Sequence, residues 1–359
     1  VKAMVGGRDF GSSKVNLALG SAGGGSGRQP GSTFKAFVLA ELVRQGYSVE
    51  ATLPAPPTIV FPKSNKGRDY SVDNYEGETF EGDINVVEAT KHSVNTVYAQ
   101  LIKAVGPAKV VDLAKKAGIT ADLSPDLSLT LGTSEVSVLD MASAYSTFAN
   151  RGEHVQPVTI LEVRTADGAL LERAKPVRTR ALSAKTADVV NYCLQQVVSG
   201  GTGTGASIGR PVAGKTGTTQ EYGDAWFVGY TPRLTTAVWM GYPEGNSHTM
   251  SNVRGRKVNG GSFPASIFKR YMTQAMKDGD YGGSFGPAGS LGGKPIPPVK
   301  AEFPSTTTSS TTPASSTTTS PASSPTSTTS TTAKPKATTT TSSSTTSSST
   351  TSTTKKPKP

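Results

Sequence analysis

Hydrophobic positions recur every three or four residues in several separate segments of the chain. The clearest segment follows the Pro30-Gly31 turn signal and ends before Gly46. This spacing is typical of a helix with one buried face, and glycine commonly follows a helix end. The pattern predicts a buried helix from about Ser32 onward, with these residues on its apolar face: Phe34, Phe37, Val38, Leu42 and Val43.

Further helices are indicated by the same spacing together with capping residues. Ser137 opens a segment that resembles a capping box with Asp140, and Ser183 is a second candidate cap. Pro107 and Gly118 bracket another apolar-periodic segment, as is typical of a helix start and stop. Helices are therefore predicted over 84–90, 96–105, 107–117, 138 to about 150, 184 to about 199, and 263–277.

Runs rich in β-branched and aromatic residues predict strands between these helices. The Asp167-Gly168 dipeptide separates two such runs and is typical of a β-hairpin turn. Strands are predicted over 3–10, 15–19, 158–164, 169–173, 212–219, 224–230 and 235–242, and the last three have the right content for an antiparallel sheet. Irregular segments are expected over the glycine-rich 20–27, the proline-rich 53–62 and the loop 200–209.

The composition changes after about residue 283. Residues 284–304 are dominated by Gly and Pro, and residues 305–359 are mostly Ser and Thr with scattered Pro and Lys. A segment with almost no apolar side chains cannot bury enough surface to fold. We therefore expect a domain over 1–283, a linker over 284–304 and a disordered tail over 305–359. The tail resembles an O-glycosylated stalk in composition, and a bare flexible tail is at least as compatible.

Charge and cysteine content exclude some functions. The formal net charge is +11, with five lysines in the tail, but the chain has no RNA-binding aromatic motif and no concentrated basic helix. A nucleic-acid partner is therefore not expected. Cys193 is the only cysteine and lies on a predicted apolar stripe, which favours a buried, inert thiol. Three histidines in unrelated contexts, without zinc spacing, make a metal site improbable. No run of 18 apolar residues indicates a membrane span.

Candidate chemistry begins with Ser32 and Lys35. They lie three residues apart, so they share one face of the predicted helix. An amine whose pKa is lowered by burial can accept the proton of a serine nucleophile. The helix N-terminus would also direct free N–H groups at an oxyanion near Ser32. Alone, a Ser-x-x-Lys match is weak, because a capped helix with a solvated lysine is the more frequent arrangement.

Two further motifs follow Ser32 and Lys35 along the chain. The first is Ser93-Val94-Asn95, and the second is Lys215-Thr216-Gly217-Thr218. Taken singly, they could be a helix-capping pair and an ordinary edge strand. The order and wide spacing of all three motifs resemble those of penicillin-binding proteins and serine β-lactamases.

Other stretches narrow the resemblance to the transpeptidase domain of class A, bifunctional penicillin-binding proteins. They are Ala3 to Phe10, Asn74-Tyr75-Glu76-Gly77, Gly223 to Tyr230 and Ala237 to Tyr242. The resemblance covers 1 to about 278 and implies a mixed α/β fold, an antiparallel sheet flanked by helices with an all-helical lobe beside it. It also implies a C-terminal piece of a longer protein, of an actinobacterial type with a Ser/Thr-rich tail. The missing part would hold a membrane helix and a glycosyltransferase domain.

The resemblance implies a D,D-transpeptidase that cross-links peptidoglycan stem peptides through an ester on Ser32 and is inhibited covalently by β-lactams. Its site would lie outside the plasma membrane, near other cell-wall synthesis proteins, and would use neither cofactor nor metal. The implied roles are a base at Lys35, helped by the charge of Lys215, a proton relay at Ser93, and substrate binding at Asn95. Backbone N–H groups of Ser32 and Thr218 would form the oxyanion hole, and these residues would bind the rest of the substrate: Lys215, Thr216, Gly217 and Thr218.

Two alternatives use the same residues differently. A D,D-carboxypeptidase or β-lactamase would transfer the acyl group to water, but no Glu-x-x-x-Asn on an Ω-type loop is recognised that would activate this water. Glu135 is followed by Val136-Ser137-Val138-Leu139. The second alternative is a non-catalytic sensor or scaffold with a degenerate site, and three intact motifs argue against it.

Overall fold

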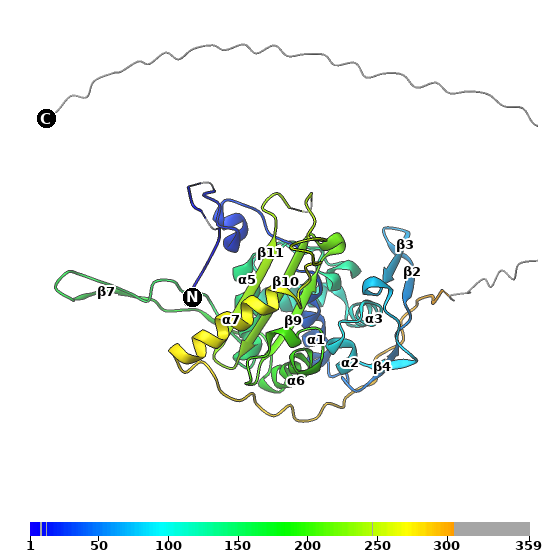
Figure 1. Cartoon of the computed structure of the whole chain (residues 1–359). Coiled ribbons are helices and arrows are strands. Elements are labelled where there is room, and N and C mark those ends of the chain that lie inside the picture. Colours follow the sequence, from blue (N-terminus) through cyan, green and yellow to red (C-terminus); the bar gives the residue numbers. More distant parts are fainter. Residues whose placement is uncertain (8, 12, 246, 305–359) are drawn as a thin grey trace, which may run out of the picture. The chain divides into compact units, whose positions relative to one another are not determined.

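The computed structural model describes residues 1–7, 9–11, 13–245 and 247–304 (Figure 1). The α-helices are α1 Lys35–Arg44, α2 Val86–Lys91, α3 Asn95–Val105, α4 Pro107–Ala117, α5 Val138–Ala149, α6 Ala184–Gly200 and α7 Phe263–Asp278. Short 3₁₀ helices are η1 Leu17–Gly23, η2 Gly31–Phe34, η3 Tyr75–Gly77, η4 Leu127–Leu131, η5 Thr204–Ala206 and η6 Gln220–Tyr222. No helix of these described residues is both long and apolar enough to cross a bilayer.

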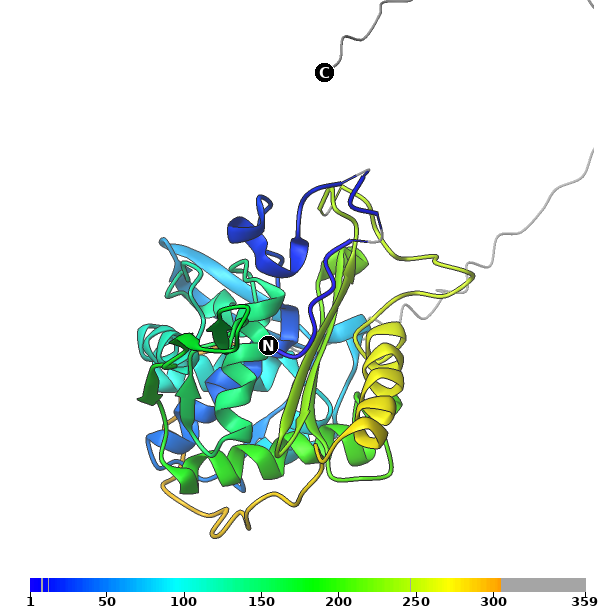
Figure 2. The ribbon, with the colours of Figure 1, turned by 90° about the vertical axis from the view of Figure 1, so that its left-hand side faces the viewer.

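A three-stranded antiparallel sheet organises the fold, with β10 between β9 and β11. These strands are β9 Ala213–Thr218, β10 Asp224–Thr231 and β11 Leu234–Gly241, close to the predicted runs. The register pairs Phe227 of β10 with Thr216 of β9 and Val238 of β11. Helix α7 covers one face of this sheet and α5 lies on the other, beside the remaining helices (Figure 2). The expected mixed fold, with helices on both faces of an antiparallel sheet, is confirmed.

The main hydrophobic core lies between the sheet and the helical lobe. Side chains of α1, α3, α4, α5 and α6 form one cluster with Trp226 and Tyr230 of β10. Phe37 of α1 is fully buried there, with its ring centroid 5.9 Å from that of Tyr145 and 5.7 Å from that of Phe148. The apolar face predicted for the helix after Ser32 therefore anchors the segment that carries the candidate nucleophile.

The predicted helix caps are confirmed. The Ser137 side chain accepts from the backbone N–H of Asp140 at the start of α5, and Ser183 accepts from that of Thr186 at the start of α6. Gly46 has φ of +85°, a conformation that glycine adopts without a Cβ penalty, where the α1 segment turns away. Cys193 is buried, and burial raises its thiol pKa to about 12, as an inert thiol requires.

The predicted N-terminal strands are wrong. The described residues of 3–10 have no regular secondary structure, and 15–19 runs into the 3₁₀ helix η1. The side chains of Val5 and Phe10 are 83% and 74% exposed, so the apolar residues that suggested a strand are not buried against the domain. The Asn16 side chain accepts from the N–H of Ala18 and caps η1 instead. The same helix occupies part of the loop expected over 20–27.

The proline-rich stretch over 53–62 was expected to be irregular, but it contains strand residues. It contributes to β1 Thr52–Pro54 and β2 Thr58–Asn65, which pair with β4 Asp83–Asn85 and β3 Arg68–Asp73 respectively. Pro54 ends its strand, and Pro62 lies where the β2–β3 register shifts. Strand ends and bulges are positions that tolerate the missing N–H of proline, which explains why the composition misled the prediction.

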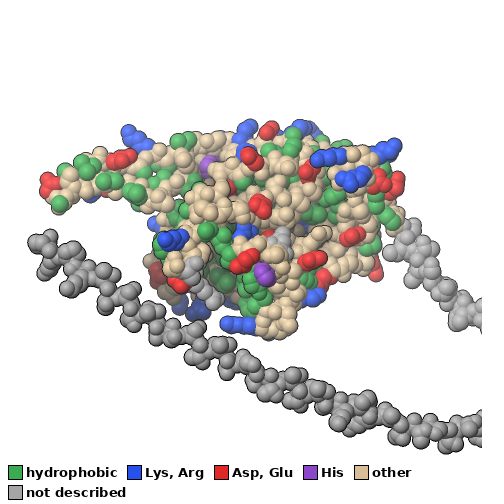
Figure 3. Space-filling view, turned by 90° about the horizontal axis from the view of Figure 1, so that it is seen from above, with side chains coloured by type: hydrophobic (Ala, Val, Ile, Leu, Met, Phe, Trp, Pro, Cys, Tyr) green, Lys and Arg blue, Asp and Glu red, His purple; other side chains and the backbone are tan. Residues whose placement is uncertain are grey.

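A two-stranded arm projects from the body beside α5 (Figure 1). It contains β6 Glu162–Arg164 and β7 Leu170–Arg173, shorter than predicted but joined at the expected Asp167-Gly168 turn. At its base, β5 Glu153–Val155 pairs with β8 Arg178–Arg180. Hydrophobic side chains line the arm (Figure 3), and Leu161 is 70% exposed. The arm therefore adds little to the core.

Residues 284–304 lie against the domain although they form no helix or named strand. Backbone hydrogen bonds join Lys294 to Gly46 and Ser48, and pair Glu302 with Val60 of β2. Phe285, Leu291 and Ile296 pack against the main core. The composition predicted a linker here, but these contacts hold the segment on the domain. We call residues 284–304 the C-terminal strap. The tail over 305–359 lies outside the described residues.

Candidate active site

Ser32 lies in η2, the 3₁₀ turn that leads into α1, and is half-buried. The Pro30 carbonyl accepts from the Thr33 hydroxyl at 2.7 Å. The Tyr145 hydroxyl of α5 donates to the Thr33 carbonyl at 2.6 Å, and the Trp226 indole of β10 donates to the Gln29 carbonyl at 2.8 Å. The turn that carries the candidate nucleophile is therefore fixed from both the sheet and the helical lobe.

The structure brings Lys35 together with Ser93 and Asn95. The Lys35 Nζ lies 2.5 Å from the Ser93 carbonyl oxygen, 2.6 Å from Asn95 Oδ1 and 3.2 Å from Ser93 Oγ. A neutral amine has two N–H donors and one lone pair. The two shorter contacts take both donors, which leaves the lone pair to accept a proton from a hydroxyl. The grouping is suited to moving a proton between a serine hydroxyl and Ser93.

The environment of Lys35 favours this neutral form. Its side chain is fully buried, and burial lowers the pKa of Lys35 well below its usual value, with the charge of Lys215 as the second cause. The carboxylate of Glu78 acts in the opposite direction but more weakly. Both causes expected from the sequence, burial and Lys215, act in the expected direction.

Ser93 lies in the break between α2 and α3, as predicted, and Asn95 is the first residue of α3 rather than part of the break. Ser93 has φ of +61°, a left-handed conformation that is strained for serine and directs its carbonyl toward Lys35. Asn95 Nδ2 donates to the Asp73 carbonyl at 2.8 Å. One amide N–H of Asn95 is thus used by the protein itself, and the second is available for the expected contact with substrate.

Strand β9 carries the third motif. Lys215 is fully buried, its Nζ donates to the Thr216 carbonyl at 3.2 Å, and burial lowers its pKa to about 7. The Thr216 hydroxyl pairs with that of Thr202 at 2.7 Å. Thr218 Oγ1 accepts from the Gly260 N–H at 3.2 Å. The Thr218 hydroxyl can still accept one further hydrogen bond from a ligand and can donate its own hydrogen to a ligand.

The structure gives a packing reason for a glycine at position 217. A Cβ there would lie 2.3 Å from the Pro30 carbonyl oxygen and 2.9 Å from the Thr33 side chain. The missing side chain therefore lets β9 approach the turn of Ser32. A Cβ on Gly31 would likewise meet the Thr218 backbone N at 2.9 Å. This close approach places Ser32 beside Thr218, as an oxyanion hole shared by the two would require.

Sequence reasoning missed Gly132. It has φ of +70°, and a Cβ there would lie 2.3 Å from the Gly31 carbonyl oxygen and 2.4 Å from its nitrogen. Gly132 follows η4 and supports the residue just before Ser32. Its position after an apolar run marks a helix stop, but nothing local in the sequence shows that it faces Gly31.

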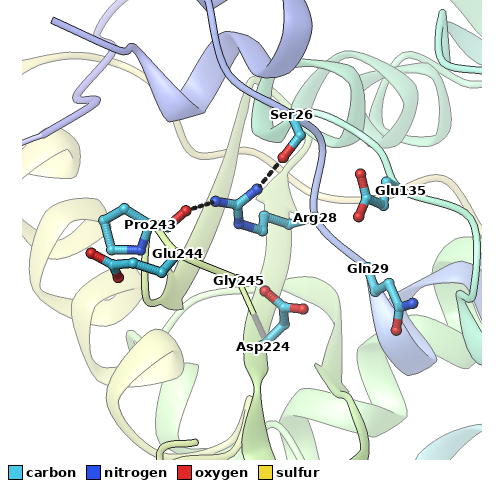
Figure 4. A pocket seen from close by; sticks show the side chains of 8 residues that line it. All are labelled: Ser26, Arg28, Gln29, Glu135, Asp224, Pro243, Glu244 and Gly245. Carbon is cyan, nitrogen blue, oxygen red and sulfur yellow. Dashed lines mark hydrogen bonds between the residues drawn. The ribbon is translucent and has the colours of Figure 1, made fainter. Parts of the chain in front are cut away.

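A polar cavity of about 220 Å³ is lined in part by Ser26, Arg28 and Gln29, which precede Ser32 in the chain (Figure 4). Arg28 donates to Ser26 Oγ and to the Pro243 carbonyl, at 2.6 and 2.7 Å. Burial raises the pKa of Asp224, and the Arg28 charge partly offsets this effect. Within the described part of the chain, no cluster of His, Cys, Asp and Glu has the arrangement of a metal site. The site thus consists of a serine, two buried lysines and polar partners.

Comparisons with known proteins agree with this fold and site. Residues 3–273 match the family model of the penicillin binding protein transpeptidase domain. The chain therefore belongs to the penicillin-binding transpeptidase family. Penicillin-binding protein 1A of Aquifex aeolicus is 35% identical over 273 residues, which cover 76% of this chain and 36% of that protein. Its counterpart in Neisseria meningitidis serogroup B is 33% identical over 285 residues, covering 77% and 34%.

A solved structure of PonA1 from Mycobacterium tuberculosis in complex with penicillin V also resembles this chain. The two share 30% sequence identity with a TM-score of 0.67, over 80% of this chain and 78% of that one. The chain spans about a third of the length of its curated relatives.

Proposed function

We propose that this domain is a D,D-transpeptidase that cross-links peptidoglycan stem peptides ending in D-Ala-D-Ala. The observation that carries the proposal is the grouping of buried Lys35 with Ser93 and Asn95, one helical turn from Ser32. The penicillin V complex of PonA1 supports β-lactams as covalent inhibitors of this chain.

In the proposed reaction, Ser32 Oγ attacks the carbonyl carbon of the penultimate D-Ala. Lys35 takes the hydroxyl proton, and the N–H groups of Ser32 and Thr218 stabilise the oxyanion. Ser93 passes a proton to the leaving nitrogen, so that terminal D-Ala departs and an ester remains on Ser32. An amine of a second stem peptide then attacks the ester, which forms the cross-link and restores the Ser32 hydroxyl.

Substrate binding is assigned to Asn95 and to β9. The free N–H of Asn95 would hold the substrate amide, while its Oδ1 orients Lys35 at 2.6 Å. Lys215 and the hydroxyls of Thr216 and Thr218 suit a terminal carboxylate, because charge-assisted hydrogen bonds are the strong ones. A bound carboxylate would also favour the protonated form of Lys215, whose pKa burial has lowered to about 7.

The longer protein to which such a domain belongs would, by family resemblance, also be a peptidoglycan glycosyltransferase. A membrane helix would hold it at the outer face of the bacterial plasma membrane, near other proteins of cell-wall synthesis. Hydrolysis, as in a carboxypeptidase or β-lactamase, is the second candidate, and it is disfavoured because no second base is recognised. The one Glu-x-x-x-Asn match in the sequence, Glu81 to Asn85, runs into β4, and its asparagine side chain accepts from the Glu88 N–H as the cap of α2. A non-catalytic scaffold would not need a fully buried lysine at 35.

The test is intact-mass measurement of the protein after incubation with a penicillin, followed over hours. We expect a one-to-one adduct on Ser32 that persists for many minutes, and its loss in Ser32→Ala and Lys35→Ala. Ser266→Ala, on the exposed face of α7, is the matched control and should acylate normally. With a donor thioester and a D-amino acid, exchange product should form beside hydrolysis product.

An adduct on another residue would contradict the site assignment. Rapid turnover of the drug would indicate a hydrolase, and absence of any adduct in folded protein would indicate a scaffold. These three outcomes differ in mass and in time course, so one experiment separates them.

A further inference from the structure

Three side chains connect the two sides of the active site at its surface. Glu76 of η3 accepts from Lys257 Nζ at 2.7 Å and from the Tyr222 hydroxyl. The Lys257 Nζ also lies over the Tyr222 ring, 5.4 Å from its centroid. The edge of the Tyr75 ring packs against Tyr222, with 6.4 Å between centroids. We call Glu76, Tyr222 and Lys257 the cleft bridge.

Each end of the cleft bridge is attached to a residue of the candidate site. On one side, η3 begins two residues after Asp73, whose carbonyl accepts from Asn95 Nδ2. On the other side, Tyr222 lies in the connection between β9, which ends at Thr218, and β10. The segment of Lys257 continues to Gly260, whose N–H donates to Thr218 Oγ1. The bridge thus joins the Asn95 side of the site to the Thr218 side.

The cleft bridge can open at little cost. The side chains of Lys257 and Glu76 are 60% and 50% exposed, and such ion pairs stabilise weakly and are screened by salt. Glu76 and Tyr222 have φ of +48° and +60°, a left-handed conformation that is unfavourable for both residue types. Opening breaks the contacts of Glu76 with Lys257 and Tyr222.

We propose that the cleft bridge is a size-selective gate, and that Glu76, Tyr222 and Lys257 are specificity-determining residues of the acylation reaction. The inference rests on the proposed function. An acyl donor that reacts with Ser32 and contacts both Asn95 and Thr218 lies between the two sides that the bridge joins. A small donor fits beneath the closed bridge, whereas a donor with a bulky side chain requires the bridge to open first.

The experiment compares acylation rates for two β-lactams of different size. One is the penicillin nucleus without an acyl side chain, and the other is piperacillin, which carries a bulky one. The variants are Glu76→Gln, Lys257→Met, the double variant, and the charge swap Glu76→Lys with Lys257→Glu. Glu162→Gln is the matched control, because it breaks an exposed ion pair with Arg173, at 2.6 Å, on the distant β6–β7 arm. Unfolding temperatures verify that every variant folds.

We expect each single variant to accelerate acylation by piperacillin up to about tenfold, the gain from releasing a gate that is closed about nine-tenths of the time. The rate with the small β-lactam should change less than about twofold. The double variant should gain no more than the better single variant, because both break one interaction. The charge swap should restore the slow rate. Added salt should accelerate the wild type but not Glu76→Gln.

Unchanged piperacillin rates, equal gains with both β-lactams, or the same gain in Glu162→Gln would each overturn the gate. The proposed function fails separately, since it predicts an adduct on Ser32 in the wild type whatever the rates of the variants.

Discussion

Replacement of Lys215 by methionine should weaken acylation and, at the same time, stabilise the fold. Lys215 is fully buried on β9, and its one hydrogen bond is to the adjacent Thr216 carbonyl at 3.2 Å. Methionine has a similar length and no charge, so it can fill the same space. The buried charge of Lys215, which we assign to carboxylate binding, thus lowers the free energy of unfolding, as is common for residues at functional sites.

The magnitude follows from the pKa of Lys215. Burial lowers it from 10.5 to about 7 in the folded state. The unfolded chain therefore binds more protons between these values, and stability rises with pH across that window. Below pH 7 both states are protonated and the cost of the buried charge is complete, about 5 kcal/mol at 1.36 kcal/mol per pKa unit. Above about pH 10.5 the cost disappears.

Chemical denaturation of wild type and Lys215→Met at several pH values measures this effect. The variant should gain most at pH 6 and progressively less toward pH 10. Lys109→Met, on the exposed face of α4, should show no such dependence. A gain that does not vary with pH, or a loss of stability at pH 6, would refute the argument that Lys215 carries a desolvated charge.

Acylation should respond in the opposite direction. Loss of a charge-assisted contact with a carboxylate costs about 2 kcal/mol, or roughly a 30-fold lower rate with carboxylate-bearing β-lactams. Because the Lys215 charge also lowers the pKa of Lys35, the rising limb of the pH–rate profile should move to higher pH in Lys215→Met. The same is expected of Lys215→Ala. Wild-type acylation kinetics in either variant would remove Lys215 from the site.

The remaining predictions concern the strap, the tail and Gly132. A chain ending at residue 304 should keep the unfolding temperature and acylation rate of the full chain. A chain ending at residue 283 should lose about 2–4 kcal/mol of unfolding free energy, because it lacks Phe285, Leu291 and Ile296, which pack against the core. Equal unfolding temperatures for the two truncated chains would contradict the packing of the strap. Gly132→Ala should slow acylation at least about tenfold by displacing Gly31. Gly67→Ala is its control, with φ of +83° and nothing within 4 Å of the added Cβ, and an equal effect there would assign the loss to backbone strain alone.

The sequence by itself determined the elements whose signals are local. Helical periodicity, the serine caps at 137 and 183 and the glycine after α1 act within a few residues, so α3 to α7 and the three strands of the sheet were predicted near their observed bounds. The order of the three motifs was sufficient to indicate the family. Lys35 was also recognised as a candidate base, because its distance of one helical turn from Ser32 is a property of the chain.

Only the tertiary structure decided what these elements meet. A strand needs a partner strand. The described residues of 3–10 form no strand, whereas the proline-rich β2 pairs with β3. The strap is polar and glycine-rich, yet backbone pairing with Gly46 and Val60 holds it on the domain.

The candidate site depends most on long-range contacts. The pKa of Lys35 is lowered because the fold buries the side chain and places the charge of Lys215, 180 residues away in sequence, near it. Its partners Ser93 and Asn95 are 58 and 60 residues away in sequence. Burial and Coulomb interactions depend on distance in space, so spacing along the chain could name these residues but could not establish that the pKa of Lys35 is lowered.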